Sequence, residues 1–195
     1  MHWLTLLLLV PAIVVPVVLL AGFAGCYASV QLDTPPFEQT FAAAFTDTDG
    51  LRGRCLVQRI ETVRLSNSGS LVQITLQALA ENVLIDRILI SQPAASGDPY
   101  DSADDLTDVT TAVTLVQPNS SVTLPAVNYN LDRTRPLLIA MDISANSGAI
   151  PFVQGVPATD AVAFFNQGAE AATKDRTTGY TSRPRIYLIE RIDVA

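Results

Sequence analysis

Aspartates crowd a polar stretch at residues 91–105, which we call the acidic loop. Calcium takes about six to eight oxygen ligands, and aspartates close together on one loop can supply them. The spacing is not that of an EF-hand, and Asp, Ser and Pro also favour turns, so a solvated loop explains the same residues. Both interpretations stay open. The candidate calcium ligands are Asp98, Asp101, Asp104 and Asp105, with Asp108 just beyond them.

Aromatic side chains bear on carbohydrate binding, because their flat apolar faces are surfaces on which sugar rings stack. Trp3 is the only tryptophan, and it lies in the N-terminal apolar segment. Tyr100 on the acidic loop and Tyr180 beside Gly179 are the tyrosines we expect to be exposed, so they are the candidate ligand-binding residues. The phenylalanines expected in the core are Phe37, Phe41, Phe45, Phe152, Phe164 and Phe165.

The chain lacks the side chains on which most enzymes depend. His2 is the only histidine, and it precedes the apolar segment, so the rest of the chain has no histidine base for a serine or cysteine nucleophile. It also has no imidazole ligand for zinc, copper or iron. A carboxylate pair could still serve a glycosidase, but the glutamates are scattered without a motif. We predict no enzymatic activity and no cofactor apart from the calcium considered above.

The formal net charge of -7 argues against nucleic acid as a partner, because an acidic surface repels phosphates. The arginines could nevertheless form a small basic face for a protein partner, since arginine is enriched at interfaces. Surface ion pairs with the many aspartates are the plainer explanation, and we prefer it. The residues concerned are Arg52, Arg54, Arg59, Arg183 and Arg185.

Residues 1–28 are the most apolar part of the chain, with no charged residue from Trp3 to Ala28. About 20 apolar residues in a helix cross the hydrocarbon core of a bilayer, which is roughly 30 Å thick. Trp3 and Tyr27 bracket the stretch, as interfacial aromatic residues do on membrane helices. We predict a membrane anchor over residues 1–28, with these two residues at the membrane interfaces.

Three interpretations of this segment stay open. We prefer an uncleaved signal anchor. A cleaved secretory signal would normally carry a basic region, which is missing. A lipoprotein signal is the third, because Phe23-Ala24-Gly25-Cys26 resembles the bacterial lipobox, which implies lipidation of Cys26. In an oxidising compartment Cys26 and Cys55 could instead form a disulfide, or Cys55 is an ordinary core thiol.

The side of the membrane is not fixed by charge, because no Lys or Arg occurs before Arg52. A long domain behind a very short N-terminus most simply crosses the membrane. The bias toward arginine and alanine favours a GC-rich bacterial or phage genome. We therefore expect a membrane-anchored protein whose domain lies in the periplasm or on the surface of a bacterial cell.

Behind the anchor we expect a linker at residues 29–36, ending in two prolines, and a β-rich domain at residues 37–195. Val72, Ile74 and Leu76 alternate with polar residues, which is the period of a half-buried strand. Many short strands with regular turns predict a single jelly-roll-like antiparallel β-sandwich, preceded by one transmembrane helix. Strands are expected at residues 53–66, 72–78, 83–90, 109–116, 121–124, 127–131, 137–143, 161–165 and 186–194, with a helical alternative only at 160–173.

Several strand-and-turn phrases are similar to a known β-sandwich module. Among them are Val63-Arg64-Leu65-Ser66-Asn67, Ile88-Leu89-Ile90-Ser91, Gly97-Asp98-Pro99-Tyr100-Asp101 and Val122-Thr123-Leu124-Pro125. The chain resembles, over roughly residues 40–195, the jelly-roll-like accessory domain found beside SGNH/GDSL-type hydrolases and in uncharacterised bacterial and phage proteins. The resemblance implies the fold and hints at glycan or surface binding. The hydrolase motifs Gly-Asp-Ser and Asp-x-x-His are missing.

From the anchor and the missing catalytic groups we predict a non-catalytic, extracytoplasmic structural or interaction protein. It would be an accessory subunit packed on a larger membrane assembly, with membrane lipid and other protein subunits as partners. The alternative is a surface lipoprotein or virion module that binds a glycan or a receptor.

Overall fold

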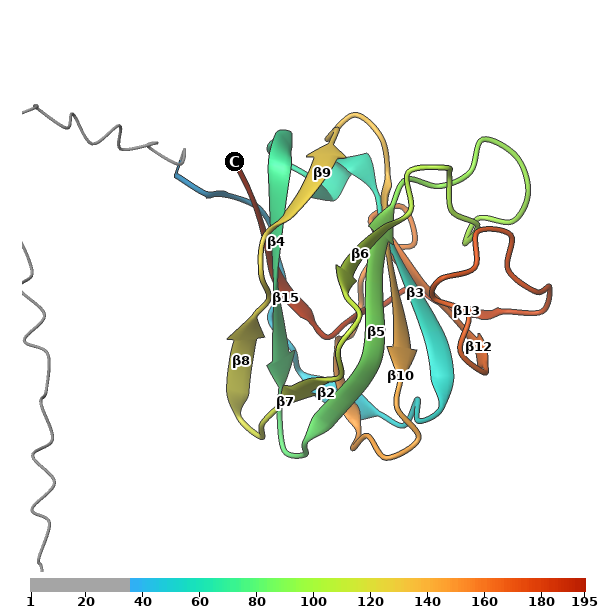
Figure 1. Cartoon of the computed structure of the whole chain (residues 1–195). Helices are drawn as coiled ribbons and strands as arrows, with labels where there is room; N and C mark the ends of the chain where they lie inside the picture. The colour runs from blue at the N-terminus through green and yellow to red at the C-terminus, as the bar shows by residue number, and fades with distance from the viewer. Residues whose placement is uncertain (1–35) are drawn as a thin grey trace, which may run out of the picture. The chain divides into compact units, whose positions relative to one another are not determined.

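A computed structural model describes residues 36–195, which form an all-β domain without an α-helix (Figure 1). Two antiparallel sheets lie face to face with the main hydrophobic core between them, and a small third sheet bridges one side. The all-β sandwich expected from the sequence is therefore confirmed.

One layer is a five-stranded sheet with the order β1-β15-β4-β8. The long strand β4 pairs with β8 along one half and with β9 along the other. The strands are β1 (Glu38–Ala42), β4 (Gly69–Ala78), β8 (Ser120–Thr123), β9 (Val127–Leu131) and β15 (Ile189–Val194).

The other layer is a seven-stranded sheet with the order β13-β12-β3-β10-β5-β6, in which β7 also pairs with β5. Its strands are β3 (Arg54–Ile60), β5 (Val83–Ser91), β6 (Thr107–Thr110), β7 (Thr114–Val116), β10 (Leu137–Ile143), β12 (Ala161–Gln167) and β13 (Thr181–Arg183).

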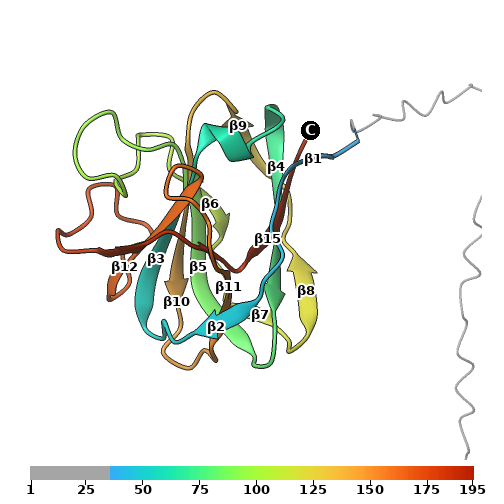
Figure 2. The same ribbon diagram turned by 180° about the vertical axis from the view of Figure 1, so that it is seen from behind.

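The small sheet has the order β14-β11-β2, from β2 (Asp47–Asp49), β11 (Ile150–Val153) and β14 (Ile186–Tyr187). Its β14 contacts β12 of the seven-stranded sheet, and its β11 contacts β4 of the five-stranded sheet. Figure 2 shows β2 and β11 on the side of the sandwich turned to the viewer. The small sheet thus closes one open side of the core.

Burial along the strands differs between the two layers. On β4, Val72, Ile74 and Leu76 are fully buried, whereas Gln73 and Gln77 keep partial exposure. On β10 every residue is buried, because the outer face of this sheet carries a second apolar cluster. Each fully buried aliphatic side chain contributes about 1.5–3 kcal/mol.

Two long loops cover that second cluster. The acidic loop connects β5 to β6, and residues 168–180, which we call the cover loop, connect β12 to β13. The loops lie side by side on the outer side of the seven-stranded sheet in both views (Figures 1 and 2). The cluster consists of Cys55, Val57, Leu89, Tyr100, Leu138, Ala140, Phe164 and Ala171.

Several expected strands have different limits in the structure. The expected strand at 53–66 ends at Ile60 and is followed by a 3-10 turn, Thr62–Arg64. The one at 109–116 is split into β6 and β7, and the last is broken at Leu188, whose φ is 58°. The helical alternative at 160–173 is wrong, because residues 161–167 form β12.

The expected phenylalanine core is correct for four of the six side chains. Phe41, Phe152, Phe164 and Phe165 are buried. Phe37 is 37% exposed because it precedes β1, so its placement in the core is wrong. Phe45 is only partly buried and packs against the edge of the main core.

Candidate functional site

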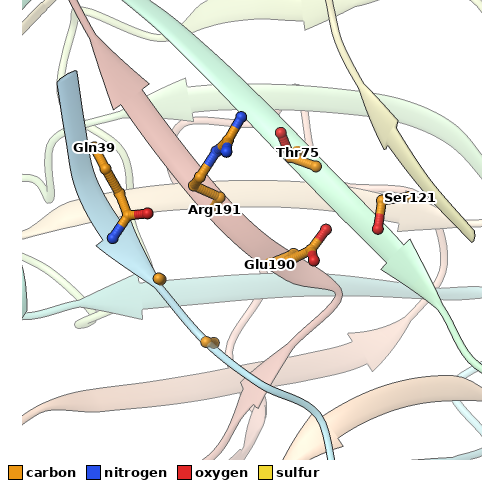
Figure 3. A pocket seen from close by; sticks show the side chains of 7 residues that line it. Gln39, Thr75, Ser121, Glu190 and Arg191 are labelled. Atoms are coloured by element: carbon orange, nitrogen blue, oxygen red, sulfur yellow. The ribbon is translucent and has the colours of Figure 1, made fainter. Parts of the chain in front are cut away.

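The outer face of the five-stranded sheet carries a groove of about 450 Å³, which we call the polar groove (Figure 3). Four strands contribute to it, so the lining residues come from distant parts of the chain and are held by sheet hydrogen bonds. The lining residues are Gln39, Ala42, Ala43, Thr75, Ser121, Glu190 and Arg191.

A β-bulge in β15 supplies the groove with two consecutive side chains. Ile189 pairs with Leu76, and Arg191 pairs with the adjacent Thr75, so Glu190 is the extra residue. In a regular strand Glu190 and Arg191 would point to opposite faces, one of them into the apolar core. A bulge re-aims the side chains around it. This surface therefore presents a carboxylate beside a guanidinium, as Figure 3 shows.

The edge strand β1, which flanks the groove, is not free to pair with another chain along its length. The carbonyl of Thr40 accepts a hydrogen bond from the backbone N–H of Ser66 at 3.0 Å. The hydroxyl of Thr40 donates to the carbonyl of Asn67 at 2.8 Å. Capped edges of this kind resist strand addition. The surface open to a partner is thus the sheet face and not this edge.

The groove offers charged groups and hydrogen-bonding groups. Arg191 Nε lies 2.8 Å from Asp193 Oδ2, and the hydroxyls of Thr75 and Thr123 are 3.0 Å apart. Within residues 36–195 no ion pair engages Glu190, which is the one carboxylate among the lining residues. Glycoside hydrolysis needs two carboxylates across the scissile bond, so the groove does not assemble that machinery.

The aspartates predicted as calcium ligands are engaged in separate contacts. Asp98 Oδ2 accepts a hydrogen bond from the hydroxyl of Tyr100 at 2.8 Å. Asp101 is buried, and its two oxygens accept backbone N–H groups of Asp98 at 2.8 Å and Arg176 at 2.9 Å. Both aspartates therefore shape the acidic loop from within.

The next two aspartates point to different neighbours. Asp104 forms an ion pair with Lys174 of the cover loop at 2.7 Å, which lowers the pKa of Asp104. Asp105 accepts the backbone N–H of Gln92 at 3.1 Å and the hydroxyl of Tyr129 at 2.8 Å. Burial raises the pKa of Tyr129, and the bond to Asp105 adds to this.

The calcium interpretation gains no geometric support from these contacts. Asp108 lies on β6, where Arg87 donates to both of its oxygens at 2.9 and 3.1 Å. No group of three or more His, Cys, Asp or Glu side chains within the described residues is arranged to hold a metal ion. Calcium binding at the acidic loop stays a prediction.

Tyr100 is not the exposed residue that the sequence suggested. Its side chain is 6% exposed, because its ring stacks on Tyr180 at 4.3 Å between centroids and contacts Phe164 at 5.4 Å. Tyr180 is partly buried and donates its hydroxyl to Glu170 at 3.0 Å. The ring faces that a sugar would use are thus packed on each other. That these tyrosines bind a ligand stays a prediction.

Arg176 is a structural residue that sequence reasoning missed. It is 2% exposed and lies in the cover loop, where its guanidinium donates to the carbonyls of Tyr100, Glu170 and Ala171 and to the hydroxyl of Ser102. A buried charge with every donor group engaged joins the two loops firmly. No spacing motif in the sequence predicts these hydrogen bonds, because the partners of Arg176 lie 5 to 76 residues away from it.

Asp142 and Cys55 lie beneath the cover loop. Asp142 accepts the backbone N–H groups of Glu170 and Ala171 at 2.9 and 3.0 Å, and burial raises its pKa. Cys55 has no exposed surface, and burial raises the pKa of its thiol to about 11. A thiol in this state is unreactive. Cys55 thus lies buried in the second apolar cluster, and its pairing with Cys26, which lies outside the described residues, stays a prediction.

The predictions for the N-terminus concern residues outside the described part of the chain. They comprise the anchor at 1–28, its interfacial residues Trp3 and Tyr27, and lipidation or disulfide formation at Cys26. Within residues 36–195, no helix has the length and apolarity needed to cross a membrane.

The five arginines of the expected basic face do not form one surface. Arg52 pairs with Glu81 at 3.6 Å, and Arg59 pairs with Glu61 at 2.6 Å. Both partners are glutamates, whereas the expected pairing with aspartate occurs at Arg183 and Arg185, which both pair with Asp49. Arg54, Arg183 and Arg185 lie apart from the two glutamate pairs, where the seven-stranded sheet meets the small sheet.

Comparison with known proteins gives no relative: no protein-family model matches the chain, and no curated protein matches it significantly. The similarity to the hydrolase accessory module therefore stays a resemblance. The function proposed below rests on the chain's own residues.

Proposed function

We propose that the protein is a non-catalytic, membrane-anchored extracytoplasmic interaction protein, an accessory subunit whose jelly-roll-like sandwich packs on a larger membrane assembly. The observation that carries this proposal is the contrast between the outer faces of the two sheets. The seven-stranded sheet is covered by the chain's own loops. The five-stranded sheet is left uncovered and carries the polar groove. The uncovered face is the contact surface.

The groove suits a protein partner because its side chains stand on strands. Gln39, Thr75, Ser121, Glu190 and Arg191 come from four hydrogen-bonded strands, so little backbone freedom is lost on binding. Arginine is enriched at interfaces between proteins. A carboxylate next to a guanidinium also makes the surface selective, since a partner must match both signs.

The proposed tether limits where a partner can be. The eight residues 29–36 span at most about 28 Å when fully extended. An anchor over residues 1–28 would hold the start of the sandwich within that distance of the bilayer. Such a short connection favours a partner that is itself embedded in or bound to the membrane.

Co-purification from native membranes tests the proposal. The wild-type full chain should come out in a fixed ratio with larger membrane proteins. Glu190→Arg should abolish this, because it makes the groove uniformly positive. Asp86→Arg is the matched control, because it makes the same charge change at an exposed position on β5. Isolation of the chain alone, or equal behaviour of both variants, would overturn the proposal.

The alternative function, binding of a glycan or receptor by a surface module, draws on the same groove. Its hydroxyl, amide and carboxylate groups match the donors and acceptors of sugar hydroxyls. Polysaccharide binding by a chain that purifies alone, lost in Glu190→Arg, would establish the alternative. The intact mass of the native chain decides in addition whether residues 1–25 are retained and whether Cys26 carries a lipid.

A further inference from the structure

Three arginines gather where the seven-stranded sheet meets the small sheet. Arg54 and Arg183 both lie over the ring of Phe165, with guanidinium carbons 5.5 and 5.0 Å from its centroid. Arg185 lies over Phe152 at 3.9 Å. Stacking on an aromatic ring fixes the plane of a guanidinium. We call Arg54, Arg183 and Arg185 the arginine cluster.

The cluster carries more positive charge than its own partners neutralise. Asp49 Oδ2 accepts hydrogen bonds from Arg183, from Arg185 at 3.1 Å and from the hydroxyl of Tyr187 at 3.0 Å. Within residues 36–195 no carboxylate pairs with Arg54. The other nearby carboxylate, Asp47, accepts the amide of Gln154 at 2.6 Å.

Within the described residues the three guanidiniums thus have one carboxylate, Asp49, as an ion-pair partner, although the net charge of the chain is -7. Asp49 is itself saturated, because its second oxygen accepts the backbone N–H of Gly50 at 2.9 Å. Most guanidinium N–H groups of the cluster remain without an acceptor in the described residues. Such donors favour an additional anion.

A groove of about 370 Å³ lies against the cluster, within the size range of ligand sites. Arg183 and Arg185 supply its charge, and Val156 and Pro184 supply apolar walls. Gly155 leaves the groove open, since a side chain at that position would meet no atom within 4 Å. Gln154 completes the lining.

We infer that the arginine cluster binds a carboxylate from an acidic segment of a partner protein. Stacked guanidiniums present their N–H groups in a fixed plane, which matches the two oxygens of a planar carboxylate. Asp49 already shows two of these arginines accommodating a carboxylate. The apolar walls suit the methylene stem of a Glu side chain. This site lies apart from the polar groove and does not depend on the function proposed for it.

Titration calorimetry with an acetylated hexaglutamate peptide tests the inference on the full chain in detergent micelles at low salt. Saturable binding to one site is expected. Arg183→Gln combined with Arg185→Gln should weaken binding about tenfold or more, since charge-assisted bonds are lost. Arg133→Gln combined with Arg135→Gln makes the same charge change on an exposed turn and should leave affinity unchanged.

Asp49→Asn gives a result of opposite sign. It keeps an acceptor oxygen but removes the negative charge that competes for the cluster, so affinity should rise several-fold. Arg54→Gln removes the one positive charge of the cluster that no carboxylate pairs with in the described residues, together with its contact with Phe165, and should lower affinity a few-fold. If the double arginine variant fails to fold, the affinities of Asp49→Asn and Arg54→Gln for the peptide test the inference instead.

Inorganic phosphate and phosphatidylglycerol vesicles are the comparison probes. We expect both to bind more weakly than the peptide and without sensitivity to Arg183 and Arg185. No peptide binding, an equal loss in the exposed-turn control, or weaker binding by Asp49→Asn would overturn the inference. Binding of phosphate or vesicles in place of the peptide would overturn it as well.

Discussion

The outer faces of the two sheets avoid exposing apolar side chains to solvent in opposite ways. On the seven-stranded sheet, Val57, Leu138 and Phe164 are apolar and buried beneath loops of the same chain. On the five-stranded sheet, Ser121 and Arg191 are polar and exposed, so the face needs no cover. The covered face therefore adds buried apolar surface to the stability of the fold, whereas the open face contributes little to it and carries the groove proposed for recognition.

The largest expected effect comes from removing the residue that joins the two loops. Arg176→Ala leaves three carbonyls and a hydroxyl without their buried donor and detaches the loops. Each buried acceptor left unpaired costs about 1–3 kcal/mol, so we expect a loss of about 3–5 kcal/mol in the free energy of unfolding, measured with urea. The exposed Arg133→Ala should stay within about 0.5 kcal/mol of wild type. A loss below about 1 kcal/mol in Arg176→Ala would show that the cover is not held by this residue.

Deletion of apolar volume should separate the two faces directly. Leu138→Ala opens a cavity beneath the acidic loop and should cost about 2–5 kcal/mol. Gln77→Ala, on the outer face of the five-stranded sheet, should change stability by no more than about 0.5 kcal/mol. Chemical denaturation of both variants provides the test. Similar losses at the two positions would remove the distinction between the faces.

The buried thiol makes the covered face sensitive to alkaline pH. The pKa of Cys55 rises from 9.0 to about 11 on folding, so the unfolded chain loses its proton first. The stabilising contribution is complete below pH 9 and is lost as pH rises toward 11, by about 2–3 kcal/mol in total. Cys55→Ala should flatten this part of the profile relative to wild type. The same slope in both chains would contradict the assignment.

The smallest effect is expected at the bulge. Glu190→Arg should alter the free energy of unfolding by no more than about 0.5 kcal/mol, because the side chain of Glu190 makes no ion pair within the described residues. Thermal unfolding beside the Asp86→Arg control measures this. A large loss of stability would mean that Glu190 is needed for folding, which would count against the groove as a recognition surface.

The sequence predicts the longer strands because their signals are local. The limits of β9 and β10 agree with the expected 127–131 and 137–143, since β9 alternates apolar and polar residues, β10 is nearly all apolar, and both are bounded by turn residues. β2 and β13 consist of three polar residues each, so their sequences show no alternation of apolar and polar residues. Such short strands form only because a neighbouring strand is already in place.

The candidate site was harder to predict than the fold. The groove depends on one extra residue in β15, whose mark in the sequence is slight: two consecutive polar residues, Glu190 and Arg191, stand between the buried Ile189 and Ile192. The stacking of Tyr100 on Tyr180 joins positions far apart in the chain, so exposure was expected where burial occurs. Local composition predicted that the acidic loop is a long connection. It did not predict that the loop's aspartates accept hydrogen bonds from other groups of the same chain.

Photo-crosslinking in native membranes tests the central claim most directly. A photoreactive residue at Ser121, exposed beside the polar groove, is compared with one at Ala172, exposed on the cover loop. The open face is predicted to yield a discrete crosslink to a membrane protein at Ser121, lost in Glu190→Arg, with none at Ala172. A crosslink at Ala172 alone, or at neither position, would contradict the account.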